Sequence, residues 1–76
     1  MFLFQLKPGQ EATVLDMQSL PSETRKKLMV MGVLPQTPVK MIRRAPMGDP
    51  IQIEVRGVSI ALRNSIAESI KVEVKG

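Results

Sequence analysis

The sequence predicts a mainly β protein: a small antiparallel barrel of about five strands, with one α-helix inserted between the first two strands and a short helical turn before the last. Three segments in the second half of the chain alternate apolar and polar residues, which is the period of a strand with one buried face: 51–56, 58–63 and 70–75. The segment 21–32 carries helix start and stop signals instead. Short strands joined by tight turns favour a barrel, and 76 residues suffice for one domain, 1–76.

The first half of the chain predicts two strands around the helix. The first covers 11–17, after the turn signal Pro8-Gly9, and the second covers 38–45, with Val39 and Met41 expected in the core.

The helix between these strands has recognisable ends. Pro21 and Ser22 are typical of a helix start, and Glu23 suits the positive end of the helix dipole. Gly32 can take the left-handed position that follows a helix, and Pro35 prevents a continuation. We therefore expect about ten helical residues.

The second half predicts a hairpin and a final helical turn. A two-residue turn at Arg56-Gly57 would place three apolar pairs on one side of the hairpin: Val55 with Val58, Ile53 with Ile60, and Ile51 with Leu62. Arg-Gly is not the favoured Asn-Gly pair, so a longer, bulged turn stays open as an alternative. The segment 65–68 fits a capping box for a single helical turn.

The stretch "PMGDP" has two readings, a tight corner or a binding loop around Asp49. Pro46 and Pro50 restrict φ, and Gly48 can adopt positive φ. Asp49 can accept a hydrogen bond from a nearby backbone amide, and no second carboxylate lies close by in sequence to share a cation. We interpret this stretch as a structural turn, like those expected at Gly32 and Gly57.

Composition argues against an enzyme and against a metal centre. The chain has no histidine and no cysteine, which removes the commonest general base and the usual transition-metal ligands. The seven acidic residues show no spacing typical of shared proton transfer, and the five glycines form no phosphate-binding loop. We expect no catalytic residue, no cofactor and no metal ligand.

The predicted helix ends in four consecutive apolar residues, 28–31. At about 100° per residue they point around most of the helix, so a helix lying on a barrel cannot bury all four. They follow the basic run Arg25-Lys26-Lys27, and an apolar patch with a charged rim is typical of a protein-binding surface. The alternative is that the loop 33–35 folds over the patch and buries it.

The net charge of +4 is compatible with nucleic acid as a second partner class. Arg43, Arg44, Arg56 and Arg63 are candidates for one basic face of the barrel. However, single-strand binders usually offer aromatic stacking platforms, and this chain has no Trp, no Tyr and only two Phe. Nucleic acid is therefore kept as an alternative and is not the expected partner.

The opening "MFLF" lacks the basic region and the longer apolar run of a signal peptide, and no apolar run approaches the length that spans a bilayer. We expect a cytoplasmic protein without direct membrane insertion.

Two stretches together resemble the FeoA family: "PGQEATVLDM" (8–17) and "RKKLMVMGVLPQTPVKMIRRAPMGDPIQIEVRGVSIALRNSIAESIKVEV" (25–74). The shared motifs are a helix ending in L-x-x-h-G-h-x-P, a strand leading to A-P-x-G-D-P, an alternating strand, and a later strand ending in h-x-L-R. The family usually has glycine after the proline of the helix-exit loop, where this chain has Gln36. That departure leaves the geometry of this turn open.

The resemblance implies an SH3-like barrel that serves as an accessory or regulatory protein of bacterial ferrous iron uptake. It implies a FeoB-type transporter with a cytosolic GTP-hydrolysing part as the partner, and recruitment to the inner face of the membrane by that partner. A further small accessory protein of the same system and weak homo-oligomerisation remain open. The alternative role is that of a free-standing regulatory module like the C-terminal domain of iron-dependent repressors.

The helix and the resemblance combine into one hypothesis. We expect the transporter's cytosolic part to contact the helix end and the loop that follows it, through Lys27, Leu28, Met29, Met31, Val33, Leu34 and Pro35.

Overall fold

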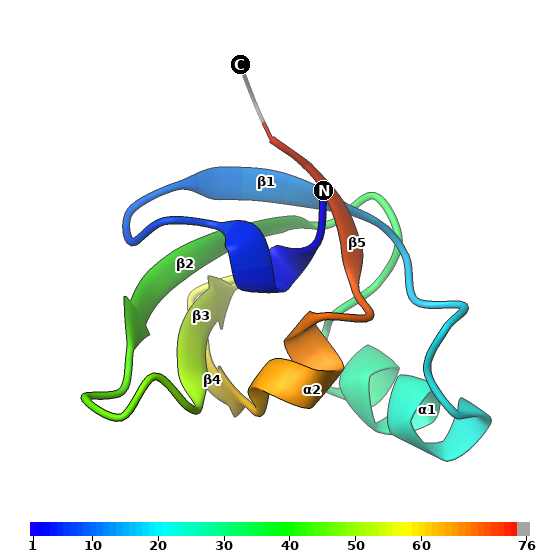
Figure 1. Cartoon of the computed structure of the whole chain (residues 1–76). Coiled ribbons are helices and arrows are strands. Elements are labelled where there is room, and N and C mark those ends of the chain that lie inside the picture. The colour runs from blue at the N-terminus through cyan, green and yellow to red at the C-terminus, as the bar shows by residue number, and fades with distance from the viewer. Residues whose placement is uncertain (75–76) are drawn as a thin grey trace.

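The computed structural model describes residues 1–74 and shows a mainly β fold (Figure 1). In chain order its elements are η1 (Leu3–Gln5), β1 (Glu11–Asp16), α1 (Ser22–Val30), β2 (Pro38–Arg44), β3 (Ile51–Val55), β4 (Val58–Leu62), α2 (Asn64–Ala67) and β5 (Lys71–Val74). The prediction of five strands, a helix between the first two and a helical turn before the last is therefore confirmed.

The strands form one antiparallel sheet in the order β4-β3-β2-β1-β5. Figure 1 shows the sheet curling around η1 and α2, which contact each other. The inward-facing side chains of the strands, the helices and the loops between them make a single apolar core, which includes Val39 and Met41 as the alternation predicts. Its fully buried large side chains are Leu3, Leu6, Leu28, Met41, Ile51, Ile53, Ile70, Val14, Val33, Val39, Val55 and Val72.

The two edges of the sheet differ in whether another segment pairs with them. The N-terminal segment covers the free side of β5, where the Leu3 amide donates to the Ile70 carbonyl (2.8 Å) and the Val72 amide donates to the Met1 carbonyl (2.8 Å). Strand β4 lies at the other end of the strand order. Within residues 1–74, closure at the β5 edge is thus achieved by the N-terminal segment and not by pairing of β5 with β4.

The β3–β4 hairpin has the predicted register, with Val55 opposite Val58 and Ile51 opposite Leu62. Arg56 and Gly57 both have positive φ, at 51° and 80°, which is the two-residue primed turn that matches strand twist. The longer turn is therefore excluded. Val58 is 56% exposed although it lies on the apolar side of the strand, because it is at the end of the sheet.

Asp49 connects two parts of the chain. It was expected to accept a hydrogen bond from a nearby amide, but its Oδ1 accepts from the amide of Asn64, fifteen residues further on (3.0 Å). The Asn64 side chain returns the contact by donating to the Gly48 carbonyl (2.8 Å), and Gly48 has φ +87°.

The start of α2 differs from the capping-box prediction for the same reason. The helix begins at Asn64, and its N-cap residue, Arg63, makes no side-chain capping bond. Asp49 supplies the acceptor from the 45–50 loop instead, so the capping box predicted at Ser65 is wrong.

Candidate functional site

The C-terminal end of α1 decides which apolar side chains are available to a partner. The Val33 amide donates to the Leu28 carbonyl (2.9 Å) and the Gly32 amide donates to the Met29 carbonyl (3.1 Å). Gly32 has φ +98°, so this is a Schellman motif, which typically joins an apolar residue in the last turn to one just past the helix. Here those residues are Leu28 and Val33.

Both residues of that pair belong to the core, which corrects two of the predicted docking residues. Leu28 is 2% exposed and Val33 is 0% exposed. The Schellman motif turns the chain back over the sheet and buries both side chains, so they cannot contact a partner in the folded protein. Of the four patch residues 28–31, the alternative of a buried patch is thus correct for Leu28 only.

Three apolar residues of the same helix end remain exposed, and we call them the α1 patch: Met29 (45% exposed), Val30 (88%) and Met31 (44%). Val30 was missing from the predicted docking residues. The signal was present in the sequence, since a residue two positions after Leu28 points about 200° away from it. Once Leu28 faces the core, Val30 must face outward.

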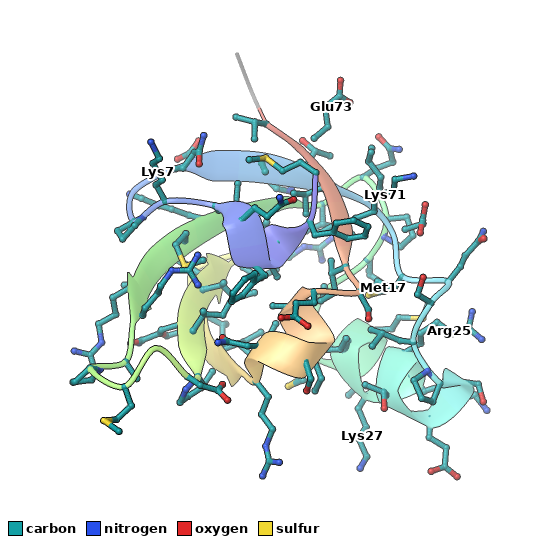
Figure 2. The ribbon with its side chains drawn as sticks, viewed as in Figure 1. Lys7, Met17, Arg25, Lys27, Lys71 and Glu73 are labelled. Carbon is teal, nitrogen blue, oxygen red and sulfur yellow. The ribbon has the colours of Figure 1, made fainter. Side chains whose placement is uncertain are left out.

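The α1 patch borders two surface hollows, the first with two basic side chains in its lining and the second with one basic and one acidic side chain. Lys26 and Lys27 line the first, of about 410 Å³, together with Val30 and Met31. Met29 and Arg25 contribute to the second, of about 190 Å³, which also includes Asp16, Met17, Gln18 and Pro35. Figure 2 shows Lys27 extending from α1 away from the sheet. The first hollow can hold an apolar group with an acidic neighbour.

The loop that follows the helix contributes less than predicted. Leu34 is half-buried, and Pro35 is exposed and lines the second hollow. Gln36 adopts φ +68°, the left-handed conformation that glycine takes most readily, and its amide donates to the Val14 carbonyl (2.7 Å). The glycine-type turn is therefore retained with glutamine in place.

Gln36→Gly is expected to stabilise the protein by about 0.5–1 kcal/mol. Glycine relieves the strain of the left-handed conformation, and this gain exceeds the loss that comes from the larger conformational entropy of glycine in the unfolded chain. The free energy of unfolding from urea titration measures the change. The control position is Gln18, an exposed loop residue that does not have positive φ. Gln18→Gly should leave stability unchanged or lower it, and equal stabilisation by both changes would contradict the strain argument.

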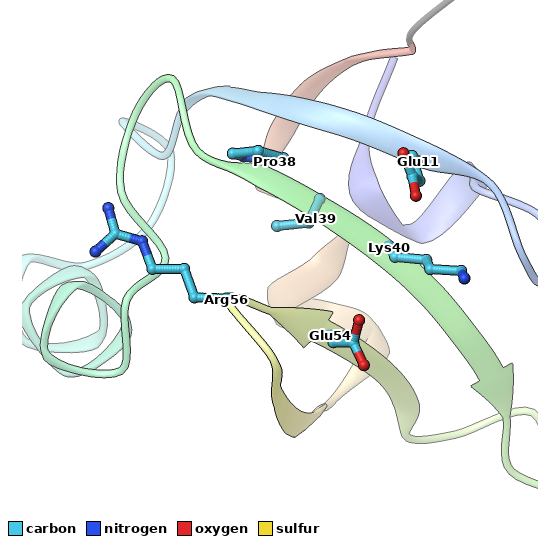
Figure 3. A pocket seen from close by; sticks show the side chains of 6 residues that line it. All are labelled: Glu11, Pro38, Val39, Lys40, Glu54 and Arg56. Atoms are coloured by element: carbon cyan, nitrogen blue, oxygen red, sulfur yellow. The ribbon is translucent and has the colours of Figure 1, made fainter.

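A third hollow, of about 240 Å³, lies on the outer face of the sheet (Figure 3). Its charged residues come from neighbouring strands: Glu11 is opposite Lys40, and Lys40 is opposite Glu54. Alternating charges across strands stabilise sheet pairing, and Figure 3 shows these side chains following one another across β1, β2 and β3. We therefore interpret the charged residues of this hollow as a row of cross-strand pairs that stabilises the sheet, and not as a binding site.

The basic face considered for nucleic acid is not continuous. A register shift after Met41 turns Arg43 outward and Arg44 to the opposite side. Arg44 is half-buried, donates to the carbonyls of Phe4 and Leu6, and lies over the Phe4 ring with its Cζ 4.8 Å from the centroid. Arg44 is therefore a structural residue that holds the N-terminal segment, and it drops out of the candidates for a basic binding face.

A protein-family model, the FeoA domain, matches residues 1–74. The chain belongs to the FeoA family. A FeoA protein from Chlorobium tepidum is 33% identical, with a TM-score of 0.95 over 100% of this chain and 71% of that one.

Two further solved structures extend the comparison. FeoA from Stenotrophomonas maltophilia in complex with zinc, described as a prokaryotic SH3 domain protein, is 28% identical, with a TM-score of 0.82 over 96% of this chain and 89% of that one. The SH3-like class of the fold is thereby confirmed. A manganese-dependent transcriptional repressor in complex with manganese has a TM-score of 0.89 over 99% of this chain and 36% of that one, and at 16% identity this shows a shared fold alone.

The residues of this FeoA-family chain that the structure describes contain no group of three or more Asp or Glu side chains placed to hold a metal ion, and the sequence has no His or Cys. Among the same residues, 1–74, no helix is long and apolar enough to cross a membrane.

Proposed function

We propose that the protein is a non-catalytic accessory factor of ferrous iron uptake that docks its α1 patch on the cytosolic, GTP-hydrolysing part of a FeoB-type transporter. Membership of the FeoA family supports the association with iron transport. The S. maltophilia relative is described as a candidate ferrous iron transport activating factor. Iron in this role is the transporter's cargo and needs no ligands on the accessory chain.

The observation that carries the proposal is the exposure of three consecutive apolar side chains at the end of one helix, with Val30 88% exposed. Burying such side chains against a partner gains about 25 cal/mol per Å² of apolar surface, whereas their exposure contributes nothing to folding. The methionines adapt to irregular partner surfaces, and the rim residues Lys26 and Lys27 suit an acidic border. Docking would hold the protein at the inner face of the membrane.

Val30→Glu is expected to weaken binding to the transporter's isolated cytosolic part by about tenfold or more, because the contact would have to bury a charged side chain where an apolar one packs. Binding is measured by biolayer interferometry, and iron uptake is followed in cells that carry the same variant. Uptake should fall together with the affinity.

The matched control is Met47→Glu, since Met47 is 92% exposed and lies in the 45–50 loop, at the opposite side of the molecule from α1 (Figure 1). Both variants should unfold at the urea concentration of the unchanged protein. If Val30→Glu binds the transporter and supports uptake as well as Met47→Glu does, the α1 patch is not the docking surface.

A further inference from the structure

Among residues 1–74, no strand pairs with the outer edge of β4. In a hairpin with a two-residue turn the residues that flank the turn, Val55 and Val58, close the first hydrogen-bonded pair, and such pairs then alternate. Ile60 and Leu62 therefore bond to β3, while the amides and carbonyls of Ser59 and Ala61 point away from it. Both residues are exposed.

This edge lacks the devices by which proteins usually protect an edge strand. The sequence of β4, VSIAL, contains no proline and no charge, and its five-residue register with β3 has no shift. By contrast, the β1–β5 and β2–β3 pairings both contain a register shift, and the edge of β5 is covered by the N-terminal segment. The N-terminal segment thus covers the β5 edge of the sheet, whereas the β4 edge is exposed. The outward-facing side chains of β4, Ser59 and Ala61, are small.

The charges around β4 indicate which strand would fit there. Arg56 precedes the strand and Arg63 follows it, and both are exposed. Antiparallel pairing of β4 with a second copy, centred on Ile60, would place Arg63 of one copy opposite Gly57 of the other and beside its Arg56. Like charges at both ends disfavour this dimer, whereas acidic residues at both ends of an incoming strand would be attracted.

We propose that β4 binds an extended segment of a partner protein as an added β-strand, with acidic residues flanking an apolar centre. The amides and carbonyls of Ser59 and Ala61 supply the ladder. Val58, which is 56% exposed, supplies an apolar contact. Arg56 and Arg63, which flank the strand, favour an incoming segment with acidic residues at its ends. The proposal does not depend on the partner of the α1 patch, since its backbone groups belong to another element.

The test follows amide hydrogen exchange by NMR with the synthetic peptide EEVTVTVEE. In the free protein the Ile60 amide should be protected by β3, and the Ser59 and Ala61 amides should exchange rapidly. Saturating peptide should slow exchange at Ser59 and Ala61 by about tenfold or more and leave the sheet pairs unchanged. Slowing at other strands, or no slowing, would overturn the proposal.

Variants separate the backbone contribution from the charge. Ala61→Pro removes an amide that points away from β3, so the fold should persist while peptide binding is lost. Arg63→Gln should weaken binding about threefold, and Lys7→Gln, a basic residue in the loop before β1 (Figure 2), should not. If the lysine-flanked peptide KKVTVTVKK binds equally well, the proposed preference for acidic flanks is wrong. If the free protein sediments as a dimer that Ala61→Pro dissociates, β4 pairs with a second copy and the proposed partner is wrong.

Discussion

Leu28→Ala is expected to lower the free energy of unfolding by about 3 kcal/mol, within the range for a buried leucine truncated to alanine. Leu28 is the one side chain of α1 that is buried, and its carbonyl accepts the amide that closes the Schellman motif. Loss of the side chain leaves a cavity and removes the apolar link between the helix and the sheet. In a domain of this size such a change is a large fraction of total stability.

The comparison variant is Val30→Ala, two residues along the same helix but 88% exposed. It should change the unfolding free energy by less than about 0.5 kcal/mol. Urea titration followed by circular dichroism measures both variants. Equal stability of the two would show that the end of α1 does not pack as described.

This difference determines how loss-of-function variants are interpreted. A Leu28 variant that abolishes iron uptake reports a damaged fold, because its side chain is not available to a partner. A Val30 variant that abolishes uptake at normal stability reports a lost contact. Only the second kind of variant tests the proposed docking surface.

The sequence was sufficient for the elements that local rules decide. The alternation in 51–56 and 58–63 predicted the hairpin with its register, because a period of two leaves one way to bury the apolar set. The signals around α1 placed its end at Gly32, where positive φ is required. In these segments local preference and tertiary packing agree.

The sequence was insufficient where four apolar residues in succession left the rotation of α1 undetermined. The Schellman motif at Gly32 is local, but the burial of Leu28 depends on the core that the sheet provides, which is a tertiary feature. The same holds for Asp49, whose partner Asn64 lies on another element. A local capping rule at Ser65 competed with this long-range bond and failed.

The two surfaces that the structure singles out lie near each other. A Cβ atom placed on Gly32, just past α1, would lie 3.8 Å from Val55 Cγ1, and Val55 is opposite Val58 at the turn end of β4. The α1 patch and the exposed end of β4 therefore approach the same part of the molecule. A partner that contacts the α1 patch with one element is in reach of β4 with an extended segment.

Arg44→Ala is expected to cost about 2 kcal/mol of unfolding free energy. The guanidinium donates to the Phe4 and Leu6 carbonyls and stacks over the Phe4 ring, so the change removes two charge-assisted hydrogen bonds and a cation–π contact. These contacts hold the segment that carries the buried residues Leu3 and Leu6 and covers the edge of β5. The free energy of unfolding of Arg44→Lys should lie between those of Arg44→Ala and the unchanged protein, since a lysine lacks the planar guanidinium that reaches both carbonyls.

Urea titration measures the loss, and hydrogen exchange shows where it acts. The Leu3 and Val72 amides, which join the N-terminal segment to β5, should exchange faster in Arg44→Ala than in the unchanged protein. Arg43→Ala is the control, because Arg43 is the exposed neighbour on the other side of the strand and should change stability by less than about 0.5 kcal/mol. Equal effects of the two alanine variants would mean that charge at this end of β2, and not the bond to the N-terminal segment, is what stabilises the fold.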